Sequence, residues 1–220
     1  MSKPNTDTAS PADARSRLVL AALRLFAEKG YESTSTREIC QAAQTNISSI
    51  RYYFGDKAGL YRAAYTECTA DMPCSGNMER YTGLSIEAAL TLLFKEFLEP
   101  LKKGEELRLL MKLHYREILE PTGVWQEQID AEIKPKHDAV VAMLKQHFGL
   151  QRTDTDVHRL AFAIIGMAVH FYVGQDIVAA IAPNMIKNAK AIDVSAQRLT
   201  TYALAIIQAE ALRRANQVNV

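Results

Sequence analysis

The segment from Thr36 to Lys57 gathers side chains able to bind phosphates and base edges. Arg51 and Lys57 carry cationic donors. On a helix that starts after Asn46, Ile50 and Phe54 lie one turn apart and face inward. The side chains left pointing outward are then Ile47, Ser48, Arg51, Tyr52 and Lys57. A helix lying in a DNA major groove needs such donors, for phosphates along its length and for base edges near its N-terminus.

Local signals place these side chains on two short helices joined by a tight turn. Ser35 and Glu38 have the spacing of a capping box, which predicts a helix start at Thr36. Asn46 is a second good N-cap residue. An earlier helix begins at Ser10-Pro11 and ends at Gly30, which predicts a three-helix unit. From spacing alone, an ordinary helical hairpin with a solvated face is the alternative.

The block ICQAAQTNISSIRYYFGDKAGLY, residues 39–61, resembles the DNA-binding signature of the tetracycline-repressor (TetR) family. The positions that carry the signature after the second helix are filled by Tyr52, Tyr53, Phe54, Lys57 and Leu60. The resemblance is specific from Arg15 to Tyr65, and it is closest to a subgroup with the motif Asn-Ile-x-x-Ile-x-Tyr-x-Phe-Gly-x-Lys-x-Gly-Leu-Tyr. Two positions depart from the pattern: Gln44 stands where the family commonly has Gly, and Arg51 where many members have Tyr.

The resemblance implies roles for individual residues on double-stranded DNA. Positions that touch the DNA backbone in the family are matched by Thr36, Asn46, Tyr52, Tyr53 and Lys57. Ser48 and Arg51 are the candidates for base edges, and Ile47 and Ser49 complete the predicted DNA-binding set. Because family members act as two-fold dimers, we expect the operator to be an inverted repeat.

Composition predicts a soluble all-α protein of one large or two modest domains. The chain has 220 residues, of which 48% are hydrophobic and 23% charged, and its net charge is +1. Many nucleic-acid-binding proteins are more basic, but a dimeric reader needs only a local basic face. The N-terminus has no secretory signal and the chain has three cysteines, Cys40, Cys68 and Cys74. These features indicate a cytoplasmic protein, with buried cysteines favoured over a redox-sensing thiol.

Breaks in the helical pattern divide the chain into four parts. We expect a disordered N-terminal tail over residues 1–9 and a helix-turn-helix DNA-binding domain over 10–56. A connecting helix follows over 57–75, and Pro73 and Gly76 mark its end. Residues 76–220 form a C-terminal helical domain for effector binding and dimerisation.

Two C-terminal helices are predicted to form the dimer. Residues 160–169 are apolar on nearly every side, yet they are too few for a membrane span of about 20 residues. The last helix, about residues 195–215, also has a wide apolar face. The alternative is that both are the core of a monomer, whereas in the family two helices from each protomer pack as a four-helix bundle. The predicted interface residues are Ile164, Ile165, Val169, Leu199, Tyr202 and Ile206.

Aromatic, methionine and histidine side chains in the C-terminal helices suit an apolar pocket with some polar groups. Plain core is the alternative for each of them, and the resemblance implies an unidentified small-molecule effector. The candidate pocket residues are Met111, His114, Tyr115, Trp125, Phe162, Met167, His170 and Phe171.

Other functional classes lack their sequence signals. His114 and Glu117 have a metal-ligand spacing, but the paired Glu-x-x-His motifs of a di-iron bundle do not occur in the sequence. No phosphate loop, G-x-S-x-G or H-E-x-x-H motif occurs either, so we expect neither an enzyme nor a cofactor or metal. A protein-binding helical adaptor would not need Arg51, Tyr52 and Lys57 on one face. A DNA-binding protein that acts without an effector remains as an alternative to an effector-released repressor.

Overall fold

The computed structural model describes residues 11–69, 78–123 and 133–218, and within them the only regular structure is helical. This confirms the predicted all-α fold. The predicted tail, the Pro73–Gly76 boundary and Trp125 lie outside the described residues. The chain forms two compact units, one of residues 1–71 with 105–122, the other of 72–104 with 123–220.

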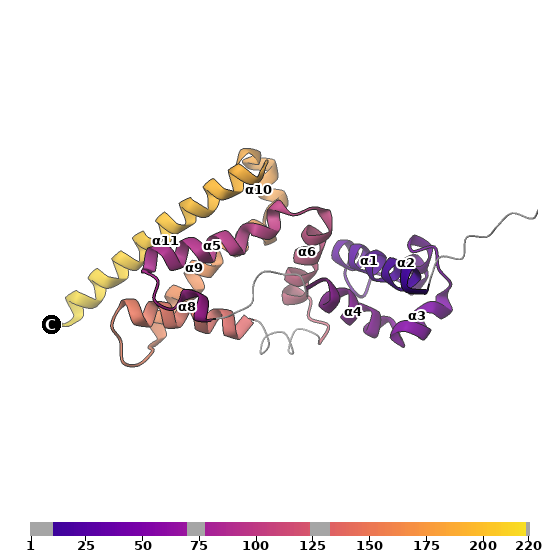
Figure 1. The fold of residues 1–220 in the computed structure, drawn as a ribbon, viewed down its shortest axis with the longest axis horizontal. Coiled ribbons are helices and arrows are strands. Elements are labelled where there is room, and N and C mark those ends of the chain that lie inside the picture. The colour runs from indigo at the N-terminus through magenta and orange to yellow at the C-terminus, as the bar shows by residue number, and fades with distance from the viewer. Residues whose placement is uncertain (1–10, 70–77, 124–132, 219–220) are drawn as a thin grey trace, which may run out of the picture. The chain divides into compact units, whose positions relative to one another are not determined.

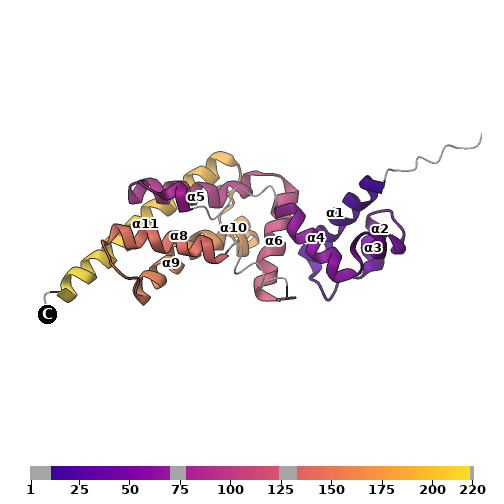
Figure 2. The same cartoon turned by 60° about the horizontal axis from the view of Figure 1, so that its bottom comes forward.

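The first unit consists of five helices in its described part, seen in Figures 1 and 2. Their bounds are α1 Pro11–Lys29, α2 Thr36–Ala42, α3 Ile47–Phe54, α4 Lys57–Thr69 and α6 Glu105–Leu119. Helix α1 packs against α2, α4 and α6, and α3 packs against α2 and α4. The core of this unit is built from fully buried apolar side chains such as Leu18, Phe26, Ile39, Leu60 and Leu113.

Gly30 ends α1 in the left-handed conformation that the sequence predicts, with a φ of +85°. Its amide donates to the Phe26 carbonyl at 2.9 Å. A Cβ at this position would lie 2.8 Å from Nε of Arg116, near the end of a flexible side chain, so it is the backbone conformation that favours glycine.

Helix α6 belongs to the first unit, although from the sequence it falls within the segment 76–220. Its buried leucines pack against α1 and α4, and two tyrosines of α4 reach its polar residues. The Tyr61 hydroxyl donates to Glu117 Oε2 at 2.5 Å, and the Tyr65 hydroxyl lies 2.6 Å from His114 Nδ1. Periodicity identifies such a helix, but it does not reveal which distant helices cover its apolar face.

The Glu117 carboxylate is fully buried and satisfied. Besides Tyr61, it accepts hydrogen bonds from the Thr122 amide at 2.8 Å and from the Thr122 hydroxyl at 3.0 Å. Burial, followed by the bond to Glu117, raises the pKa of Tyr61 beyond its ordinary range, so this hydroxyl stays protonated and remains a donor.

The second unit is a bundle of longer helices in which α11 packs along α5, and α9 packs against α8, α5 and α11. Its core includes Leu90, Phe94, Leu144, Ile164 and Ala203. The bounds of its helical elements are η1 Met78–Tyr81, α5 Ile86–Leu98, η2 Glu99–Lys102, α8 Lys134–His147, α9 Thr155–Val173, α10 Gln175–Ile181, η4 Pro183–Met185 and α11 Ala189–Val218.

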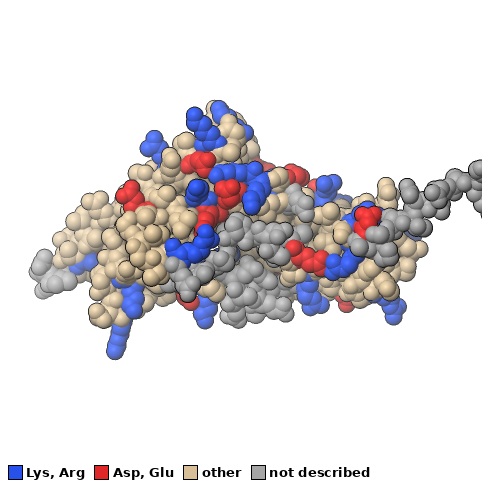
Figure 3. Space-filling model, in the orientation of Figure 1, with Lys and Arg blue, Asp and Glu red and all other residues tan. Residues whose placement is uncertain are grey.

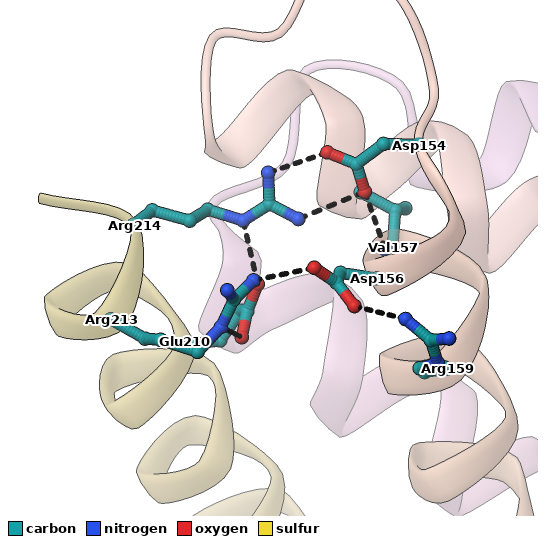
Figure 4. A network of polar contacts seen from close by, with 7 residues as sticks. All are labelled: Asp154, Asp156, Val157, Arg159, Glu210, Arg213 and Arg214. Carbon is teal, nitrogen blue, oxygen red and sulfur yellow. Dashed lines mark hydrogen bonds and ion pairs between the residues drawn. The ribbon is translucent and has the colours of Figure 1, made fainter. Parts of the chain in front are cut away.

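An ion-pair network fixes the end of α11 to the start of α9, which makes these two helices antiparallel (Figure 4). Arg214 donates to both oxygens of Asp154, at 2.7 and 3.0 Å, and Arg213 donates to Asp156 at 2.7 Å. Asp154 also caps α9 through the Val157 amide. Arg214 first, and then this amide, hold the pKa of Asp154 far below its usual range.

Helix α9 is longer than its apolar stretch 160–169, because the Asp154 cap starts it five residues earlier. By length and composition alone it is one helix in the described chain apolar enough to cross a membrane. It buries one face against α5, α8 and α11, as the core helix of a globular domain does. Part of its surface stays open in the single chain, where Phe162 is 66% exposed although its ring also lies beside that of His137 on α8. The sequence predicts that a second chain covers part of this helix in the dimer.

Candidate DNA-binding interface

The capping box predicted at the start of α2 is confirmed. The Ser35 hydroxyl accepts from the Glu38 amide at 3.2 Å, while the Glu38 carboxylate accepts from the Ser35 amide. Lys29 of α1 donates to the same carboxylate at 2.7 Å. These contacts, the one from Lys29 first, lower the pKa of Glu38 to about 2. The start of α2 is thereby fixed to the end of α1.

The turn between α2 and α3 keeps its shape without glycine. Gln44 adopts a φ of +53°, and it is the one described non-glycine residue with positive φ. The neighbouring Thr45 amide donates to the Cys40 carbonyl at 2.9 Å, which closes the turn. Gln44 therefore takes the left-handed conformation that its glycine counterparts adopt at lower cost.

Asn46 caps α3, as predicted from its type and position. Its Oδ1 atom lies 3.1 Å from the Ser48 amide and 3.1 Å from the Ser48 hydroxyl. The capped helix is anchored in the core by Ile50, which is 3% exposed. Phe54, expected to face inward with it, is half-buried.

The outer face of α3 carries four of the five side chains predicted there, while Lys57 begins the next helix, α4. Ile47, Ser48, Arg51 and Tyr52 are exposed, with Tyr52 reaching 81%. Ser49 and Tyr53 are half-buried, and the Tyr52 and Tyr53 rings meet edge to face with centroids 4.8 Å apart. A short helix thus presents hydroxyl, guanidinium and aliphatic groups on one accessible surface.

Two further predicted contacts flank this helix. Thr36, the first residue of α2, and Lys57, the first residue of α4, are both half-buried. The Lys57 ammonium lies 4.3 Å from the centroid of the Tyr31 ring, a cation–π contact that orients it. Tyr31 in turn packs edge to face on Tyr61, with ring centroids 5.1 Å apart.

Arg51 and Arg37 are exposed cations that form no ion pair within the described part of the chain. Two other cations of the first unit are neutralised by ion pairs, Arg15 with Glu67 and Lys29 with Glu38. Arg37 was not among the predicted DNA contacts. It is exposed and follows Thr36 in the first turn of α2, and this place beside a predicted contact was the signal available in the sequence.

On the face seen in Figure 3, charge does not form a single basic surface. In the view of Figure 3, lysine and arginine side chains are interspersed with acidic ones. The net charge of +1 agrees with this pattern. Attraction to DNA must then come from a few placed cations rather than from the whole molecule.

Three candidate pocket residues lie on α6 in the first unit. Met111 and Tyr115 are buried, and His114 is hydrogen bonded to Tyr65. Its ring also meets the Tyr115 ring edge to face, at a centroid distance of 5.3 Å. Each of these side chains therefore has partners within the unit.

The other described pocket candidates lie on α9 in the second unit. Phe171 is buried, Met167 is half-buried, and His170 and Phe162 are exposed. The Phe162 ring lies 4.4 Å from the ring of His137 on α8. His137 Nε2 is 2.9 Å from His158 Nδ1, with ring planes 9° apart.

The six predicted interface residues divide by burial. Ile164 and Leu199 are buried inside the protomer's own core. Tyr202 is 54% exposed, and the rest, Ile165, Val169 and Ile206, are half-buried. These four, together with the open apolar faces of α9 and α11, are the residues available to a second chain.

Comparison with known proteins agrees with this architecture. Residues 18–64 match the family model for bacterial regulatory proteins of the tetR family. Residues 86–209, more than half of the chain, match the model for the C-terminal domain of the HTH-type transcriptional dual regulator CecR. In the described residues, no group of three or more metal-ligating side chains comes together.

Individual relatives are also transcription regulators. The chain is 28% identical to the dual regulator CecR of Shigella flexneri over 177 residues, 75% of this chain and 78% of that protein. A match to the repressor AcnR of Corynebacterium glutamicum is 36% identical but spans 28% of this chain and 33% of the relative.

Two structures with 19% identity show the fold. A mutant of HlyIIR, a hemolysin II transcriptional regulator, has a TM-score of 0.62 over 88% of this chain and 97% of that chain. NalD, the secondary repressor of the MexAB-OprM multidrug efflux pump in Pseudomonas aeruginosa, has a TM-score of 0.59 over 89% and 97%. The chain therefore belongs to the tetR family of bacterial regulatory proteins, as a DNA-binding transcription regulator with a CecR-type C-terminal domain.

Proposed function

We propose that the protein is a cytoplasmic homodimeric repressor that binds an inverted-repeat operator and is released from it by a small-molecule effector. The observation that carries the DNA-binding part is the outer face of α3, where Arg51 is exposed and unpaired within the described chain beside Ser48 and Tyr52. A helix that followed a tight turn only for structural reasons would not need a free guanidinium there.

The hydrogen-bond inventory supports separate roles on DNA. Asn46 has committed its carbonyl oxygen to the cap, so its NH₂ group is left to donate to a phosphate. Lys57, held over Tyr31, places a positive charge that suits a phosphate. The hydroxyl groups of Thr36, Tyr52 and Tyr53 suit a phosphate as neutral hydrogen-bond donors. Arg51 has the fork geometry for bidentate recognition of a guanine.

Dimerisation is supported by apolar surface that one chain leaves open on α9 and α11. Exposed aliphatic and aromatic side chains recur on these antiparallel helices: Phe162, Val173, Val194, Tyr202 and Leu212. A stripe of this kind along two adjacent helices is typical of an interface rather than of a solvated surface. Two copies would bury it as a four-helix bundle.

The effector part of the proposal rests on the family resemblance and on the α4–α6 contacts. Tyr61 and Tyr65 fasten α4 to α6, and Lys57 begins α4. An effector that favoured a displaced α6 would shift α4, and with it a predicted phosphate contact. The buried candidates Met111 and Tyr115, with His114, lie on that same helix.

Selection from a pool of random duplexes tests the proposal. At low and moderate salt, the purified protein should enrich an inverted repeat whose half-sites lie about one helical turn of DNA, ~34–36 Å, or slightly more apart. Failure to enrich any sequence would refute the DNA-binding role. Enrichment of an asymmetric single site would refute the two-fold dimer, and a small-molecule thermal-shift screen without any response would favour a regulator that needs no effector.

A further inference from the structure

The cap of α3 fixes the direction of a hydrogen bond on the DNA-facing surface. The Ser48 backbone amide can only donate, so the Asn46 atom 3.1 Å from it must be the carbonyl oxygen Oδ1. That oxygen has lone pairs and no proton. The Ser48 hydroxyl, also 3.1 Å from the same atom, must therefore donate to it.

Toward any further partner, the Ser48 hydroxyl can then offer only the lone pairs of its oxygen. Its single proton is directed at Asn46, and no residue of the described chain donates to its oxygen. The side chain is exposed at the second position of α3. Toward an approaching molecule, Ser48 is thus a hydrogen-bond acceptor.

In the major groove, only two groups can donate to such an acceptor, namely the N6 amino group of adenine and the N4 amino group of cytosine. The groove atoms of guanine and the O4 atom of thymine accept, and would meet lone pairs instead. Resting on the proposed DNA-binding role of α3, we infer that Ser48 recognises the exocyclic amino group of adenine or cytosine and discriminates against the keto bases.

The alternative reading has a structural cost. A serine usually adapts to any base by rotating its hydroxyl proton. Here, donation to a guanine or thymine oxygen would remove the proton from Asn46 and give up one bond of the cap. The Asn46–Ser48 pair therefore turns a versatile side chain into a selective one.

Base analogues placed in the selected operator test the inference. In both half-sites, each adenine is replaced by purine and each cytosine by pyrimidin-2-one, which removes one amino group at a time. At one symmetric position the loss should weaken binding of the wild-type protein by roughly 2- to 12-fold per half-site, the range of one neutral hydrogen bond. The same analogue should have no effect on Ser48→Ala.

Asn46→Gly provides a second variant that releases the hydroxyl, because glycine is nearly as good an N-cap and leaves Ser48 in place. Its affinities for natural bases at the Ser48-dependent position should become nearly equal, since the freed hydroxyl can also donate. The affinities of this variant are compared as ratios between operators that differ at that position. A loss of affinity common to all operators therefore cancels.

Two results would overturn the inference while the DNA-binding role stands. One is that removal of a keto oxygen from the operator weakens binding of the wild-type protein but not of Ser48→Ala. The other is that no removal of an amino group distinguishes the wild-type protein from Ser48→Ala. A protein that enriched no operator would instead overturn the proposed function, and this inference with it.

Discussion

The buried Tyr61–Glu117 hydrogen bond should contribute more to stability than its neighbour on the same helix. Tyr61→Phe removes the donor to Glu117 Oε2 at 2.5 Å, while the Thr122 hydroxyl, 3.0 Å from the same oxygen, stays in place. Because Glu117 is fully buried, water cannot replace the lost donor. A hydrogen bond to an ionised group contributes about 1.5–3 kcal/mol, so we expect the free energy of unfolding to fall by about 2 kcal/mol.

Tyr65→Phe is the matched control, since it deletes the same hydroxyl from the same helix at an equally buried position. Its partner is the imidazole nitrogen His114 Nδ1 rather than a carboxylate, so we expect a loss of about 1 kcal/mol. Urea unfolding followed by circular dichroism measures both losses. Hydrogen exchange should locate them in α4 and α6. If Tyr61→Phe lost no more stability than Tyr65→Phe, Glu117 would not depend on Tyr61 and our account of the α4–α6 contact would be wrong.

Three further outcomes are expected. Gln44→Gly should raise the free energy of unfolding by about 0.5–1 kcal/mol in urea titrations, because glycine relieves the left-handed backbone at φ +53°; a decrease would show that the turn is unstrained. Burial, and then His158, lower the pKa of His137, so the unfolded chain binds the extra proton first. Stability should therefore be complete above pH ~6.5 and fall below it, and less steeply in His137→Gln; an unchanged slope would contradict this. Ile206→Asp should give monomers or aggregates in sedimentation, since it buries an unpaired charge at the proposed interface; an undisturbed dimer would place the interface elsewhere.

Local features of the DNA-binding unit were predictable from the sequence because they depend on neighbouring residues. The Ser35 and Asn46 caps need partners two or three residues away, and both were confirmed. The left-handed Gly30 likewise follows from residue type and position. The outward face of α3 follows from helical periodicity once Ile50 is anchored in the core.

Features that depend on distant residues were not predictable in this way. The pattern identified α6 as a helix, yet its place in the first unit depends on Tyr61, Tyr65 and the buried face of α1. The apolar stretch in α9 predicted a helix partly covered by a second chain, but coordinates were needed to show which side chains one chain leaves open, such as Phe162. The direction of the Ser48 hydrogen bond also required coordinates, because it is set by the oxygen that the cap turns toward it.

The sequence preference of Arg51→Ala tests the central claim, that α3 reads DNA, most directly. Wild type and variant are put through the same random-duplex selection, with Lys57→Ala as a control at the phosphate-facing start of α4. We expect Arg51→Ala to relax the preference at one symmetric position, by about 1–3 kcal/mol of lost discrimination per half-site. Lys57→Ala should weaken binding to all sequences and flatten its salt dependence. A uniform loss of affinity in Arg51→Ala, with the preferred sequence unchanged, would make Arg51 a phosphate contact and contradict the account.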